Sequence, residues 1–152
     1  MIQRIQSLYL LAVSVLMVTV SFVSVAGFTT PTGVLSMRLT GVYDSAANSA
    51  LLFGTWPLQL LAVLIALIAL ATIFLFNNRK LQIKLSAVSL WLIVLFLGAF
   101  IVYLFLIPGK LNAAFSFEIP SLLPLAALLL NVLALRAIRA DEELVRSLDR
   151  LR

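Results

Sequence analysis

Four long apolar runs without a charged residue constrain this chain more than any other feature. They cover residues 8–28, 56–76, 85–107 and 119–135, and none of them contains Asp, Glu, Lys or Arg. A run of about 20 apolar residues lets an α-helix cross the roughly 30 Å hydrocarbon core of a membrane. The pattern therefore predicts an all-α integral membrane protein, a bundle of four transmembrane helices that forms one domain over residues 1–152.

The residue types that are missing exclude most catalytic chemistry. The chain has no Cys and no His, which excludes thiol nucleophiles, disulfides, iron–sulfur clusters, His-ligated haem and ordinary zinc sites. The apolar runs also lack the acidic residues that build proton or cation pathways through a membrane. We therefore predict that the protein is not an enzyme, with no catalytic residue, no cofactor and no metal site.

The first apolar run has two interpretations. Arg4 gives it a weakly basic start, and Ser24, Val25 and Ala26 resemble a small-x-small cleavage site, so a secretory signal peptide is one of them. Signal peptides have apolar stretches of about 7–15 residues, and this run is longer. An uncleaved membrane anchor is the favoured interpretation, because three further spans follow it.

The positive charges predict the orientation of the chain in the membrane. With the N-terminus inside, nine of the eleven basic residues are cytoplasmic: Arg4, Arg79, Lys80, Lys84, Arg136, Arg139, Arg146, Arg150 and Arg152. Only Arg38 and Lys110 fall outside. The positive-inside rule then predicts a multi-pass protein of the inner (cytoplasmic) membrane with both termini cytoplasmic. Topology explains the whole net charge of +5, so we do not expect nucleic-acid binding.

The two external loops carry alternating apolar residues. Leu35, Met37 and Leu39 alternate with polar residues in the first loop, and Phe115 and Phe117 do so in the second. Alternation with a period of two is typical of a half-buried strand. We predict a small extracytoplasmic β-sheet built from residues 34–43 and 114–119, with irregular loops as the alternative.

A few residues mark helix ends and helix contacts. Thr55 is a candidate N-cap of the second helix, and Pro108 is expected to stop the third. Ser14, Ser21 and Asn131 are polar residues inside the spans, where Ser and Asn bond across helix interfaces. Asn131 is thus interpreted as a buried amide that bonds to a neighbouring helix, with a ligand or ion contact as the alternative.

The sequence pattern of the C-terminal segment 139–152 predicts an amphipathic cytoplasmic helix. Leu144, Leu148 and Leu151 fall at i, i+4 and i+7, which places them on one helix face. This tail is either a separate helix or a continuation of the fourth span. Its leucine face is expected to pack on the chain's own loop, on the lipid interface or on a partner.

Three stretches together resemble a known family. They are MIQRIQSLYL at residues 1–10, NNRKLQIKL at residues 77–85 and DEELVRSLDRLR at residues 141–152. In this order they resemble a bacteroidete family of uncharacterised four-helix inner-membrane proteins, a domain of unknown function. The resemblance implies a bacterial inner-membrane location and four spans, and it implies no reaction.

These observations predict a non-enzymatic membrane protein that acts through protein or lipid interactions at its cytoplasmic face. The candidate interaction surface consists of polar residues from the N-terminus, the short cytoplasmic loop and the tail: Gln3, Arg4, Gln6, Arg79, Lys80, Lys84, Glu142, Glu143, Arg146, Asp149 and Arg150. The expected partners are membrane lipids and a membrane or cytoplasmic protein. The alternative is a small-molecule or lipid-handling protein or a transporter accessory subunit.

Overall fold

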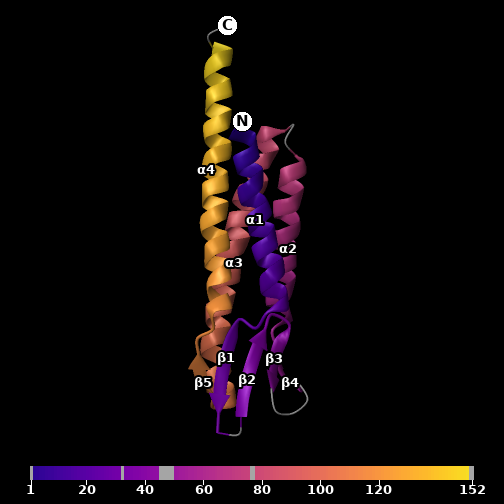
Figure 1. Cartoon of the computed structure of the whole chain (residues 1–152), viewed down its shortest axis with the longest axis vertical. Helices are drawn as coiled ribbons and strands as arrows, with labels where there is room; N and C mark the ends of the chain where they lie inside the picture. The colour runs from indigo at the N-terminus through magenta and orange to yellow at the C-terminus, as the bar shows by residue number, and fades with distance from the viewer. Residues whose placement is uncertain (1, 32, 45–49, 76–77, 151–152) are drawn as a thin grey trace.

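The protein is an elongated four-helix bundle with a small β-sheet at one end (Figure 1). A computed structural model describes residues 2–31, 33–44, 50–75 and 78–150, with side chains except at 2–4 and 145–150. The elements in chain order are α1 (Ile2–Phe22), β1 (Ala26–Thr30), β2 (Gly33–Arg38), β3 (Gly41–Asp44), β4 (Leu51–Gly54), α2 (Trp56–Phe74), α3 (Arg79–Leu111), β5 (Ala114–Ser116), the 3₁₀ turn η1 (Ile119–Leu122) and α4 (Leu123–Arg150).

All four α-helices are long and apolar enough to cross a membrane, judged by length and composition. Their outward faces carry large apolar side chains; Phe22, Phe74 and Phe105 are each more than three-quarters exposed. A helix that buries its apolar stripe in a water-soluble bundle keeps polar residues on the opposite face, and these helices do not. The four predicted helical spans are therefore present in the fold.

The helices pack in a ring in which neighbours in sequence are neighbours in space. α1 packs against α2 and α4, and α3 packs against the same two helices. Ala62, Ala66 and Ala69 lie on the buried face of α2, and Ala127 and Ala134 lie on that of α4. Small residues at these positions let neighbouring helix backbones approach closely, as the sequence pattern indicates.

The predicted sheet is confirmed, and it is larger than the two predicted segments. Five antiparallel strands lie in the order β4-β3-β2-β1-β5, so the α1–α2 and α3–α4 connections both contribute to one sheet. Leu35, Met37 and Leu39 are buried, as their alternation predicts. β5 pairs with β1 and has no direct pairing with β2.

The first apolar run is not one continuous helix. α1 ends at Phe22, and Ala26–Thr30 forms β1, so the last part of the run 8–28 belongs to the sheet. Gly27 and the β-branched Val23 and Val25 are poor helix formers, and β1 gains ladder hydrogen bonds on both of its edges. The prediction of a helix through Phe28 was wrong for this reason.

The prediction that Pro108 stops the third helix was also wrong. α3 continues to Leu111 and ends at Asn112, whose φ of 48° is left-handed. The Pro108 carbonyl accepts hydrogen bonds from the backbone N–H groups of both Asn112 and Ala113, which closes the last turn. A proline this close to a helix end removes one N–H donor and leaves the terminal turn intact.

The structure differs in detail from two predictions about helix ends, those for Thr55 and for the fourth apolar run. Thr55 occupies the N-cap position of α2 without capping it; its buried hydroxyl donates to the carbonyls of Arg38 (3.0 Å) and Leu39 (3.1 Å). Thr55 thus ties α2 to the end of β2. The fourth apolar run starts with η1, and α4 then continues through the tail without a break to Arg150. Residues 151 and 152 lie outside the described residues.

Candidate functional site

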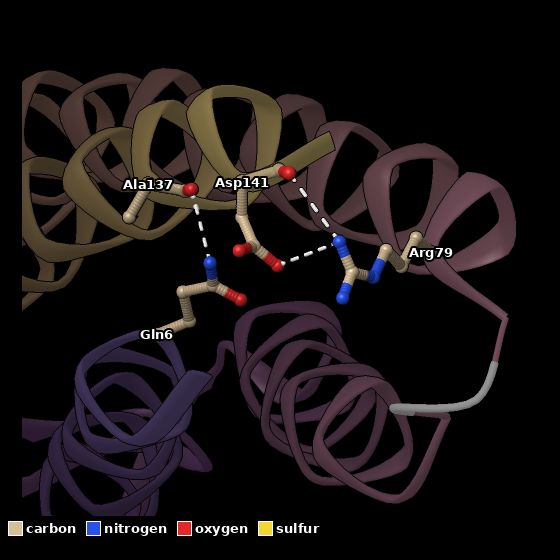
Figure 2. A network of polar contacts seen from close by, with 4 residues as sticks. All are labelled: Gln6, Arg79, Ala137 and Asp141. Carbon is tan, nitrogen blue, oxygen red and sulfur yellow. Dashed lines mark hydrogen bonds and ion pairs between the residues drawn. The ribbon is translucent and has the colours of Figure 1, made fainter. Parts of the chain in front are cut away.

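Three chain segments meet at the end of the bundle opposite the sheet. The start of α1, the start of α3 and the C-terminal half of α4 come together there (Figure 1). Gln6 donates a hydrogen bond from Nε2 to the Ala137 carbonyl over 3.0 Å. Arg79 Nη1 lies 3.1 Å from Asp141 Oδ2 and donates to the Asp141 carbonyl over 3.3 Å. We call Gln6, Arg79, Ala137 and Asp141 the clasp (Figure 2).

Helical periodicity places the clasp residues. Gln6 continues the buried face of α1 that includes Leu10, Val13 and Met17, and its side chain is 2% exposed. Asp141 lies three residues after Ile138, the last fully buried residue of α4 that the structure describes. Both polar side chains therefore sit where the apolar seam between helices reaches its end.

The charges of the clasp also suit the helix ends. Arg79 occupies the first turn of α3, where the positive end of the helix dipole disfavours a cation. Asp141 supplies a carboxylate and a backbone carbonyl that offset this. Because the two side chains keep 33% and 18% of their exposure, the ion pair contributes about 0–1 kcal/mol. Such a contact orients a helix more than it stabilises a fold.

The other predicted surface residues outside the clasp differ in how exposed they are. Lys80, Lys84 and Glu143 are exposed, and Glu142 is half-buried. The remaining predicted side chains lie outside the described residues: Gln3, Arg4, Arg146, Asp149 and Arg150. The tail helix over residues 141–152 was expected to meet the N-terminus and the loop 79–84, but Asp141 itself is not among the predicted surface residues. The signal that could have found it is its spacing of seven residues from buried Ala134, which keeps it on the packed face of α4.

Several polar residues inside the spans bond to protein groups. Asn131 is fully buried and donates from Nδ2 to Ser89 Oγ of α3 over 2.9 Å, so it links two helices as interpreted. Ser21 donates to the Met17 carbonyl of its own helix (3.1 Å), and Ser14 is buried in α1. Gln82 of α3 donates to the Thr72 carbonyl of α2 (3.3 Å). Sequence reasoning missed Ser89 and Gln82, because a single polar residue in an apolar run does not reveal which helix faces it.

The structure also contains two apolar grooves. One lies between α1 and α2, has a volume of about 220 Å³, and includes Gln59 and Ser21 among otherwise apolar walls. The other, of about 440 Å³, lies between the end of α3 and β5 and is lined by Phe105, Pro108 and Phe115 with two further apolar residues. Neither has a charged residue in its walls. Among the described residues, no group of three or more Asp or Glu side chains could hold a metal ion.

Comparison with known protein families identifies the family of this chain. A family described as "Domain of unknown function (DUF4293)" matches residues 2–151. The chain belongs to this family. The DUF4293 match covers all four helices, the five strands and the clasp, so the whole fold described above is the DUF4293 domain of this chain. No curated protein and no solved structure matches the sequence.

Proposed function

We propose that this DUF4293 protein is a four-span protein of the inner membrane that docks a protein partner through the projecting end of α4. In this proposal both termini are cytoplasmic, and the sheet lies on the opposite side of the membrane. The bias of nine basic residues against two supports that orientation. The exposed apolar side chains along all four helices support a location in lipid.

The observation that carries the proposal is the continuation of α4 beyond the bundle. From Asp141 the helix runs on to Arg150, a distance of about 14 Å, and it extends past the starts of α1 and α3 (Figure 1). The clasp holds the base of this projecting segment from two sides. A helix that is held at its base and continues past the ends of its neighbours suits recognition by another chain.

The chemistry of the projecting segment favours a protein over lipid as its partner. Leu144 is 53% exposed, and Leu148 follows it by four residues, which is one helical turn. The segment continues the direction of the bundle (Figure 1), and in the proposed orientation this direction leads away from the membrane surface. An amphipathic helix that binds lipid lies in the plane of the interface. A groove or helix of another protein suits a projecting helix with an apolar face.

Cysteine labelling tests the orientation. Val34→Cys in the sheet and Ala140→Cys in α4 both introduce thiols at exposed positions, and the natural chain contains no cysteine. In intact cells whose outer membrane has been permeabilised, a membrane-impermeant maleimide should label Val34→Cys and leave Ala140→Cys unlabelled until the inner membrane is opened. Labelling of both before opening would contradict the assignment.

Charge exchange in the clasp tests docking. A photocrosslinking amino acid at position 144 should give a discrete crosslinked protein band from cells. Arg79→Asp or Asp141→Arg alone should reduce that band several-fold, because like charges at the base misorient α4, and the double exchange should restore it. The amount of inserted protein should stay unchanged, since the pair contributes only about 0–1 kcal/mol.

Arg38→Asp is the control for this experiment. Arg38 is exposed at the sheet end of the molecule, so reversing its charge should leave the crosslinked band at full intensity. A band that persists in both single clasp variants would contradict a role for the clasp in docking. It would leave lipid anchoring as the better account of the basic residues.

A further inference from the structure

Two fully buried side-chain atoms, one on α3 and one on α4, have no hydrogen-bond partner among the described residues. They are Ser86 Oγ and Asn131 Oδ1, and both residues are 0% exposed. Buried polar atoms in folded proteins are almost always paired, either with protein groups or with ordered water. Because α3 and α4 pack against each other, one explanation for both unpaired atoms is worth seeking.

Both residues are neighbours of Ser89 of α3, and we call Ser86, Ser89 and Asn131 the polar cluster. Asn131 Nδ2 donates to Ser89 Oγ over 2.9 Å, which fixes the amide against α3. Ser86 lies one helical turn before Ser89 on the same face of α3, at a rise of about 4.5 Å. Exchanging the assigned positions of the Asn131 amide oxygen and nitrogen still leaves one of these two atoms without a partner. The Ser89 hydroxyl serves one end of the amide in either orientation, and the other end stays unpaired.

The polar groups of the cluster determine which kind of molecule can pair with the two unpaired atoms. The available groups are an amide oxygen, which accepts, and a hydroxyl, which both donates and accepts. Asp141, the nearest described acid along α4, is ten residues from Asn131 and is engaged by Arg79 in the clasp. A buried cation would thus lack a compensating charge, which is costly. A neutral molecule with donors and an acceptor, small enough for a packed interface, is water.

We propose that an ordered water molecule lies between α3 and α4, donating a hydrogen bond to Asn131 Oδ1 and accepting one from the Ser86 hydroxyl. The water site lies six residues, or about 9 Å, deeper in the bundle than Ala137 of the clasp. It fixes the position of α4 along α3 from inside the bundle, whereas the clasp fixes it at the end. The site does not depend on the docking function proposed above.

The sign of one stability change tests the proposal. If water bridges the two atoms, Ser86→Ala removes a ligand of the water and leaves Asn131 Oδ1 poorly paired, so the thermal unfolding midpoint of the full-length protein in detergent should fall by several degrees. If Ser86 Oγ is unpaired, the same change removes a buried orphan group, and the midpoint should rise or stay unchanged. A rise or no change overturns the proposal.

The same substitution in a second variant and a control substitution make this test more specific. In Asn131→Leu the water loses its main partner, so Ser86→Ala should raise the midpoint there instead of lowering it. Ser21→Ala is the control, because the Ser21 hydroxyl bonds only within its own helix and the change should be small. A high-resolution structure in lipid should show density between Ser86 and Asn131. A Ser86 hydroxyl bonded to a backbone carbonyl of its own helix, without that density, would also overturn the proposal.

Discussion

Replacing Phe28 with alanine should lower the free energy of unfolding by about 3–5 kcal/mol, the usual cost of removing a large buried aromatic side chain. Phe28 is fully buried in β1, opposite Leu35 of β2 and Phe115 of β5. It belongs to the core cluster that also contains Met17 of α1 and Ile93 of α3, so the sheet and the bundle share one core. The change should therefore loosen the sheet and the adjoining helix ends together.

Reversible unfolding in mixed micelles, followed by far-UV circular dichroism, measures this effect. Phe115→Ala is the matched control, because Phe115 contacts the same ring at 6.0 Å between centroids but is 47% exposed. Its loss should cost about 0.5–1.5 kcal/mol, the value of an aromatic pair. If Phe28→Ala cost no more than Phe115→Ala, the sheet would not be anchored to the bundle through Phe28.

Replacing Gly41 with alanine should cost about 1–3 kcal/mol, the usual range for overpacking. A Cβ at Gly41 would lie 2.9 Å from the Phe53 carbonyl oxygen and 2.2 Å from Leu51 Cδ1. The leucine methyl can rotate away, but the carbonyl belongs to the backbone of β4 and can move only if β4 moves. The expected result is weakened pairing of β3 with β4, measured as faster amide exchange in residues 51–54 and a lower unfolding midpoint.

Gly54→Ala is the control for Gly41→Ala, because the two glycines face each other in the same strand pair. A Cβ at Gly54 would meet no atom closer than Trp56 Cδ1, at 4.0 Å. This change should be neutral, or slightly stabilising through the unfolded chain. Equal destabilisation by both changes would mean that loss of glycine flexibility, and not the contact with Phe53, governs this edge of the sheet.

The helices were predictable because their signal is long and local. A span such as 56–76 needs no partner to be recognised, since its length and lack of charge are sufficient. The alternation of Leu35, Met37 and Leu39 was also local and predicted a strand. β1 was not predictable in this way. Its buried stretch Ala26–Phe28 is apolar and directly extends the apolar run of α1, and only pairing with β2 and β5 distinguishes it.

The candidate site was predictable in part for a related reason. Gln6 and Arg79 were recognisable as polar residues at the end of a span, but the helix that would receive them was not. The ring order, in which α1 lies beside α4, depends on packing between distant segments and has no local signal. The same holds for Ser89, which becomes significant only when Asn131 is seen opposite it.

The strand order has a consequence for the order in which the protein assembles. β1 follows α1 directly in the chain, and the partner of one of its edges, β2, comes next in the same loop. The partner of its other edge is β5, which is made only after the whole of α2 and α3. Until then β1 presents unpaired backbone groups, the kind of edge that binds other strands. A chain truncated within α3 therefore keeps an unpaired strand edge, and synthesis of β5 completes the sheet before α4 is made.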